Sequence, residues 1–195
     1  MNSEHPEEQT TAAADAPPVK RQLSLLSEIR GWARDVFFAI GTAIIIVVFF
    51  YQPVKVEGTS MLPELVDQER IFVNKFVYRI GRMERGDIVV FWYPLDATKS
   101  YIKRVIGLPG DVVEVNRGKV IVNDEVLDEI YVPPNYFDRR SYKSIQVEPG
   151  HYYVLGDHRN QSNDSRMWGL VPEQNIYGKA VFRYWPMSKD RKSVV

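Results

Sequence analysis

The sequence predicts a mainly β protein, in which an antiparallel β-sheet domain follows a single N-terminal transmembrane helix. Two observations predict this fold. One is an apolar run without charge, residues 36–51, near the start of a chain of 195 residues. The other is the pattern after it, where short apolar runs are separated by turn residues with no helical period between them, as is typical of antiparallel sheets. We therefore expect one domain of ordinary size and one anchor.

The composition excludes several classes of protein and site. The formal net charge is zero, so no excess of positive charge indicates nucleic acid as a partner. The chain has no cysteine, which excludes a disulfide framework and thiolate zinc sites. Its three histidines, at positions 5, 151 and 158, lack the spacing of a metal site. We expect no metal and no cofactor.

The first 35 residues predict two segments of different character. Residues 1–22 carry Glu, Thr, Ala and Pro with few bulky apolar side chains. Such a segment cannot bury enough apolar surface to offset the entropy lost on ordering, so it predicts a disordered cytoplasmic tail. Residues 23–35 predict a short amphipathic helix next to the membrane. Its apolar residues are Leu25, Leu26, Ile29 and Trp32.

Residues 36–52 are predicted to form the transmembrane anchor, although the uncharged run is slightly shorter than the roughly 20 residues that span a bilayer comfortably. A cleavable signal peptide would end in a small-x-small site, which is absent here. A buried core helix would show a polar stripe, which is also absent. The basic residues before the run are Lys20, Arg21, Arg30 and Arg34. By the positive-inside rule they place the N-terminus in the cytoplasm and residues 53–195 outside it, at the cell membrane.

Short apolar runs predict the strands of the β domain, residues 53–195. The predicted strands are 54–56, 71–73, 88–91, 102–106, 112–115, 120–122, 152–155 and 180–184. The segment from Asn116 to Lys119, between two of these strands, predicts a hairpin. Residues 133–148, rich in Pro, Tyr, Arg and Asp, are predicted to form an excursion from the sheet.

Ser60 is the candidate nucleophile. It lies between Gly58 and Pro63, which allow the backbone to turn sharply and expose a hydroxyl. A serine hydroxyl needs a base that removes its proton. Lys103 can be that base if burial favours its neutral form, whereas Arg104 cannot lose its proton. On spacing alone, a structural turn and a surface lysine account for the same residues.

A third polar stretch, residues 156–166, offers supporting groups and a rival base. Asp164 and Arg166, two positions apart, suit a hydrogen-bonded pair beneath a site. His158 leaves a serine–histidine–aspartate triad open. Asp157 is poorly placed to orient its neighbour, because adjacent side chains on a strand point to opposite faces, but Asp164 remains possible.

Four motifs follow the apolar run in order: Ser60–Pro63, Arg85–Phe91, Lys103–Asp111 and Gly156–Arg166. In this order and behind an N-terminal anchor, they resemble the motifs of type I bacterial signal peptidases, the leader peptidase family. The resemblance covers residues 36–185. It implies an antiparallel β catalytic domain of the signal peptidase type. It also implies a membrane-anchored serine endopeptidase, a hydrolase that removes N-terminal signal peptides from exported preproteins during protein secretion.

The resemblance implies roles for single residues. Ser60 matches the nucleophile and Lys103 the general base. Ser162 matches a serine that orients the lysine, and Asp164 and Arg166 match a supporting ion pair. Family substrates bind as an added β-strand. The residues that fall where the substrate pockets would be lined are Val54, Val56, Leu65 and Ile102. The implied partners are signal peptides and the lipid bilayer, without nucleic acid, and we expect a monomer.

Three positions depart from the family pattern. Glu64 stands where threonine is usual, and His158 stands where asparagine is usual. Gly58 occupies a position where some members supply a serine hydroxyl to the oxyanion hole. The backbone N–H of Ser60 then remains as one oxyanion donor.

Two other functions stay open on the residues alone. One is a different enzyme of the serine–lysine group, such as a self-cleaving repressor, against which the predicted anchor and the lack of a DNA-binding helical pattern argue. The other is a non-catalytic, membrane-tethered β domain that binds peptides at a strand edge. This second function requires Ser60 and Lys103 to lie beyond hydrogen-bonding distance.

Overall fold

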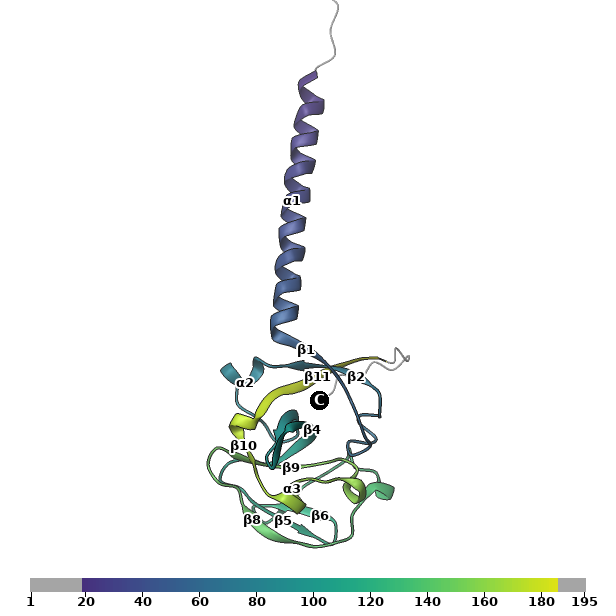
Figure 1. The fold of residues 1–195 in the computed structure, drawn as a ribbon, viewed down its shortest axis with the longest axis vertical. Coiled ribbons are helices and arrows are strands. Elements are labelled where there is room, and N and C mark those ends of the chain that lie inside the picture. The colour runs from purple at the N-terminus through teal and green to yellow at the C-terminus, as the bar shows by residue number, and fades with distance from the viewer. Residues whose placement is uncertain (1–18, 186–195) are drawn as a thin grey trace, which may run out of the picture. The chain divides into compact units, whose positions relative to one another are not determined.

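A computed structural model describes residues 19–185 of the chain, which divides into two compact units, residues 1–45 and 46–195 (Figure 1). Of the predicted tail, residues 1–22, the first 18 residues lie outside the described part of the chain. Its last four residues begin the first helix. Each unit is described by itself.

Helix α1, Val19–Phe50, is continuous where the sequence predicted two segments, 23–35 and 36–52. No proline lies within it, so nothing in the backbone interrupts the helix. It ends at Phe50 because Pro53 follows closely, and the residue before a proline disfavours helical backbone. Tyr51 and Gln52 therefore begin a strand and do not extend the helix.

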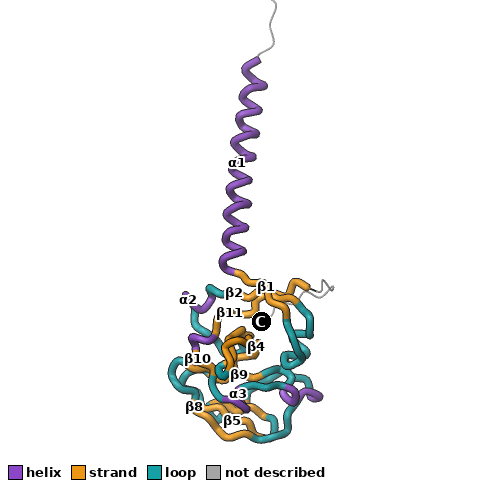
Figure 2. Tube along the Cα trace, viewed as in Figure 1, coloured by secondary structure: helices purple, strands orange, loops and turns teal. Residues whose placement is uncertain are grey.

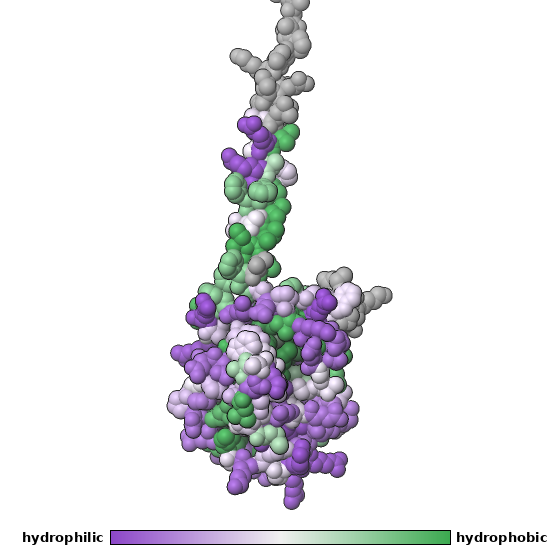
Figure 3. All heavy atoms as spheres, in the orientation of Figure 1, coloured by the Kyte–Doolittle hydropathy of each residue, from purple (hydrophilic) through white to green (hydrophobic). Residues whose placement is uncertain are grey.

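The apolar side chains of α1 are exposed over its second half (Figure 3). The large ones exposed are Phe37, Phe38, Ile40, Ile44, Ile45, Ile46, Val47 and Phe49. Within residues 19–185, however, no helix meets both the length and the apolar character that a membrane crossing requires. The antiparallel β part of the predicted fold class is confirmed, and the anchor over residues 36–52 is not shown.

The larger sheet of the β unit has seven strands, all paired antiparallel (Figure 2). Its spatial order is β1 (Tyr51–Lys55), β2 (Arg70–Asn74), β11 (Ile176–Trp185), β3 (Ile88–Tyr93), β4 (Asp96–Gly107), β9 (His151–Leu155) and β10 (Val171–Pro172). Strands β1 and β10 form its edges. The predicted strands in these regions are confirmed, apart from shifted ends.

The smaller sheet has four strands, β7 (Glu125–Val126), β6 (Lys119–Val122), β5 (Val112–Asn116) and β8 (Tyr142–Gln146), in that order. Strands β5 and β6 form the predicted hairpin, with positive φ at Arg117 and Gly118, as in a type I′ turn. The predicted excursion over residues 133–148 is wrong at its C-terminal end. Its residues 142–146 form β8, because Ile145 and Tyr142 pack half-buried against the smaller sheet's core.

Two short α-helices, α2 (Val77–Ile80) and α3 (Ser165–Trp168), connect strands of the larger sheet, as do the 3₁₀ turns Arg159–Gln161 and Glu173–Asn175. A third 3₁₀ turn, Pro134–Tyr136, lies between β7 and β8 of the smaller sheet. Strand β3 is buried on both faces. Ile88 and Val90 join one apolar cluster with Met61 and Leu65, whereas Val89 and Phe91 join another on the opposite face. The site described below is therefore built on a sheet whose central strand cannot shift easily.

We predict that Gly118→Ala destabilises the fold more than Gly110→Ala. Both glycines have φ near 90°, where a side chain costs about 1–2 kcal/mol. A Cβ at Gly118 would also lie 2.4 Å from the carbonyl oxygen of Asp138, whereas Gly110 has nothing within 4 Å. The clash adds roughly 1–3 kcal/mol. Thermal melting of both full-length variants measures the difference, and equal melting temperatures would contradict it.

Candidate active site

Ser60 lies on a turn that is fixed to the core on both sides. Val56, Met61 and Leu65 are buried in one apolar cluster, so the loop that carries Ser60 is packed down at three points. Gly58 has φ of +93° and donates its N–H to Asp67 Oδ1 at 2.8 Å, which closes the turn. The hydroxyl of Ser60 is thereby presented at a half-buried position.

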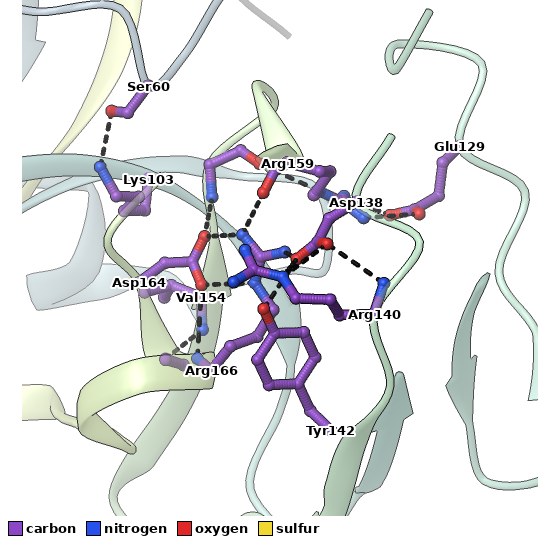
Figure 4. Close-up of polar contacts among 12 residues, drawn as sticks. Ser60, Lys103, Glu129, Asp138, Arg140, Tyr142, Val154, Arg159, Asp164 and Arg166 are labelled. Carbon is purple, nitrogen blue, oxygen red and sulfur yellow. Dashed lines mark hydrogen bonds and ion pairs between the residues drawn. The ribbon is translucent and has the colours of Figure 1, made fainter. Parts of the chain in front are cut away.

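Lys103 comes from β4 and meets this hydroxyl. Its Nζ lies 2.7 Å from Ser60 Oγ (Figure 4). It also donates to the carbonyl oxygen of Ile102 at 3.0 Å. Only 4% of Lys103 is exposed. Burial lowers the pKa of Lys103 to about 8, against the opposing effect of the carboxylates of Asp164 and Asp157. A lysine that loses its proton this readily is suited to activate a serine.

Among the described residues, no carboxylate orients the imidazole of His158 for the rival triad. Both carboxylate oxygens of Asp157 accept from Arg104, at 2.9 and 2.7 Å. Asp164 accepts from Arg166 and from the backbone N–H of Gly156. The imidazole Nδ1 lies 3.0 Å from the carbonyl oxygen of Thr59. The geometry favours lysine over histidine as the base.

Asp164 and Arg166 form the ion pair that the sequence predicted. Asp164 caps α3 by accepting from the Arg166 N–H, and the guanidinium of Arg166 returns to the same carboxylate at 2.8 Å. Arg166 also donates to Asp138 and to the carbonyl oxygen of Arg159. These bonds fasten the segment after β9 to the rest of the unit. That segment passes directly over the Ser60 turn, since a Cβ at Gly156 would lie 2.4 Å from the Ser60 carbonyl oxygen.

Ser162, predicted to orient the lysine, makes no such contact in the structure. Its Oγ is buried and has no hydrogen-bond partner among the described residues. A Cβ at Gly156 would meet this oxygen at 2.2 Å, so Ser162 packs against Gly156. The carbonyl oxygen of Ile102 is the group that holds Lys103 Nζ besides Ser60.

Several residues that support the site were not predicted from the sequence. Glu129 pairs with Arg159, and Asp138 binds Arg140, Tyr142 and Arg166 (Figure 4). These partners lie far from the third polar stretch in sequence, and no motif in the sequence marks them. Asp138, Arg140 and Tyr142 lie in the predicted excursion, residues 133–148, whose richness in Tyr, Arg and Asp was their one signal, and Glu129 precedes it without any such signal.

A cleft of about 510 Å³ opens beside Ser60 and Lys103. Three of the four predicted substrate-binding residues line it, namely Val54, Val56 and Ile102. Leu65 is fully buried in the core and does not line the cleft. In the part of the chain that the structure describes, no cluster of His, Asp or Glu is arranged to hold a metal ion.

Comparisons with known proteins agree with the family that the motifs indicated. The model of the family "Signal peptidase, peptidase S26" matches residues 29–185. A probable signal peptidase I-2 of Synechocystis is 38% identical over 93% of this chain and 81% of its own length. A signal peptidase I of Leptolyngbya laminosa is 38% identical over 96% of this chain and 93% of its own. Signal peptidase I P of Bacillus subtilis subsp. natto is 36% identical over 86% and 94%.

We predict that the stability of the chain depends on pH through Lys103. Its pKa is lower in the folded state, about 8, than in the unfolded state, near 10.4. The unfolded chain therefore binds more protons between these values, so this contribution to stability grows as pH rises through that window and is lost as pH falls through 8. Lys103→Met removes the penalty of burying the charge. It should melt no lower than wild type at mildly acidic pH.

Thermal melting of wild type and Lys103→Met from mildly acidic to alkaline buffers measures this effect, with Ser60→Ala as the matched control for loss of the shared hydrogen bond. A Lys103→Met protein that melts well below wild type at acidic pH would mean that Lys103 is charged and favourably paired.

Proposed function

Because this chain belongs to the signal peptidase family, peptidase S26, we propose that it is a serine endopeptidase that removes N-terminal signal peptides from exported preproteins with Ser60 and Lys103 as its catalytic pair. One observation carries the assignment of the pair. A buried lysine with a lowered pKa lies 2.7 Å from the hydroxyl of a serine at the edge of a cleft.

The proposed reaction is acyl transfer through an ester. Ser60 Oγ attacks the scissile carbonyl carbon while the neutral Lys103 Nζ takes the hydroxyl proton. The tetrahedral intermediate collapses as the C–N bond breaks, and Lys103 gives that proton to the leaving amine. A water then attacks the ester carbon, and Lys103 takes a proton from it. The C–O bond to Ser60 breaks, the proton returns to Ser60 Oγ, and the signal peptide leaves with a free carboxylate.

Two free strand edges support binding of the substrate as an added strand. Among the described residues, β1 pairs with β2 on one side only, and β4 pairs with β9 only from Arg104 onward. Residues of both strands, Val54 and Ile102 among them, line the cleft. An extended peptide between these edges would gain main-chain hydrogen bonds, and its alternate side chains would face the cleft. The non-catalytic binding function loses its support, because Ser60 and Lys103 lie within hydrogen-bonding distance.

We extend the proposal to the membrane. Residues 36–50 of α1 carry no charge, and four basic residues precede them in the sequence. The run is shorter than the roughly 20 residues of a comfortable span, so aromatic residues at its ends, Trp32 and Tyr51, would lie in the interfaces. The N-terminus would then be cytoplasmic, and the β unit would lie outside the cytoplasm. We propose that the protein acts as a monomer.

We predict that Ser60→Ala and Lys103→Met each reduce preprotein cleavage by on the order of 10⁴-fold, because the members of a coupled pair fail together. The matched control is Lys99→Met, which removes an exposed lysine on the same strand, paired only with Asp96 among the residues described. It should cleave as wild type does. The assay is incubation of detergent-solubilised protein with a preprotein, followed by separation of the two products. Near-normal cleavage by Lys103→Met would disprove the pair.

The topology has its own test, which uses the absence of cysteine from the chain. Glu28→Cys and Glu148→Cys each introduce one thiol at an exposed position. We expect Glu148→Cys to react with a membrane-impermeant maleimide added outside intact cells, and Glu28→Cys to react only after the membrane is opened. The reverse pattern would place the β unit in the cytoplasm and contradict the positive-inside argument.

A further inference from the structure

The peptide unit between Thr59 and Ser60 has two hydrogen-bonding ends. Its N–H belongs to Ser60 and donates to no acceptor among the described residues. Its carbonyl oxygen belongs to Thr59 and lies 3.0 Å from His158 Nδ1. A carbonyl oxygen only accepts, so Nδ1 carries the proton of the imidazole in this contact.

His158 is held firmly enough to direct this bond. Only 6% of the residue is exposed, and its ring packs edge-on against Tyr136 with the ring centroids 4.3 Å apart. Its own backbone N–H donates to the Ser60 carbonyl oxygen at 3.0 Å. The carbonyls on both sides of the Ser60 Cα are therefore fixed by one residue. His158 follows β9 in a segment that Asp164 holds by accepting a hydrogen bond from the backbone N–H of Gly156.

The position of this bond matters for the proposed reaction. When the substrate carbonyl becomes tetrahedral, negative charge develops on its oxygen, and preorganised N–H donors stabilise that charge. A hydrogen bond to the carbonyl of a peptide unit polarises its N–H, and it fixes the direction in which that N–H points. Gly58 has no side chain that can supply a hydroxyl donor. Stabilisation of the oxyanion therefore depends more on the Ser60 N–H, on its direction and on its strength as a donor, than it would if residue 58 supplied a hydroxyl.

We propose that His158 is a positioning residue for the oxyanion hole, acting through the Thr59–Ser60 peptide unit and not on the substrate itself. The inference rests on the proposed function. It also predicts which side chains can replace histidine at position 158. In asparagine, Nδ2 is attached to Cγ as Nδ1 is in histidine, so asparagine presents a donor at nearly the same place. Glutamine presents its donor one bond farther out.

The test compares three substitutions at this position, His158→Asn, His158→Gln and His158→Ala. His151→Ala is the matched control, because His151 Nδ1 also bonds a backbone carbonyl, that of Pro149 at 3.1 Å, away from the cleft. For each full-length protein, kcat and KM are measured with a preprotein. The inhibition constants of a peptide boronic acid and of the unreactive peptide of the same sequence are measured in parallel. The boronic acid forms a tetrahedral adduct on Ser60, so it reports on the oxyanion hole.

We expect His158→Ala and His158→Gln to lose about tenfold in kcat, less than the ~10²–10³ that follows removal of a donor, with KM unchanged. Binding of the boronic acid should weaken in proportion, and binding of the unreactive peptide should not. The kcat of His158→Asn should stay within about threefold of the wild-type value. The kcat of the control, His151→Ala, should equal that of wild type. Thermal melting checks that each variant folds. If His158→Ala does not fold, the comparison of asparagine with glutamine decides.

Equal kcat in all three variants would overturn the inference while leaving the proposed function intact. So would a loss that appears in KM and in both inhibitors alike, because that pattern indicates a damaged cleft. A wild-type protein that cleaves no preprotein would disprove the proposed function itself, and the inference with it.

Discussion

The site depends on the cost of burying an ammonium group. Lys103 is almost fully buried, so its ammonium group loses hydration and its charged form is disfavoured. Two carboxylates near it act in the opposite direction, those of Asp164 and Asp157. Asp164 is paired with Arg166 and Asp157 with Arg104, and the charge of Arg166 also lowers the pKa of Lys103. The loss of Arg166 would therefore raise the pKa of Lys103.

The ion pairs around the segment after β9 are therefore better understood as electrostatic and positional devices than as sources of stability. Arg104, Arg159 and Arg166 are nearly or fully buried as side chains, and each has a carboxylate partner. Burying such pairs costs desolvation energy that their attraction only partly offsets. What they provide is a fixed path for the segment that passes over the Ser60 turn, and the contact between Gly156 and the Ser60 carbonyl depends on that path.

Local pattern was enough to predict eight of the eleven described strands and the hairpin, because alternation and turn residues are properties of neighbouring positions. β8 was missed since its sequence, Tyr142–Gln146, is mostly polar and follows a proline-rich stretch, and only pairing with β5 makes it a strand. Ser60 and Lys103 are 43 positions apart, so no spacing rule joins them, and the family resemblance was what predicted their contact. That resemblance also predicted a contact between Ser162 and the lysine, which this structure lacks.

The start of β1 directly after α1 has a consequence for reach. Val54, the first residue that lines the cleft, follows the last helical residue by four positions. Four residues of extended chain cover roughly 14 Å at most. Whatever direction the helix takes, the cleft therefore begins within about 14 Å of the helix end. If α1 is the anchor proposed above, a scissile bond carried far from the bilayer by a folding domain lies beyond the reach of the cleft. Under that proposal, the distance between a substrate's apolar segment and its cleavage site would be a criterion of selection in addition to the residues of the pocket.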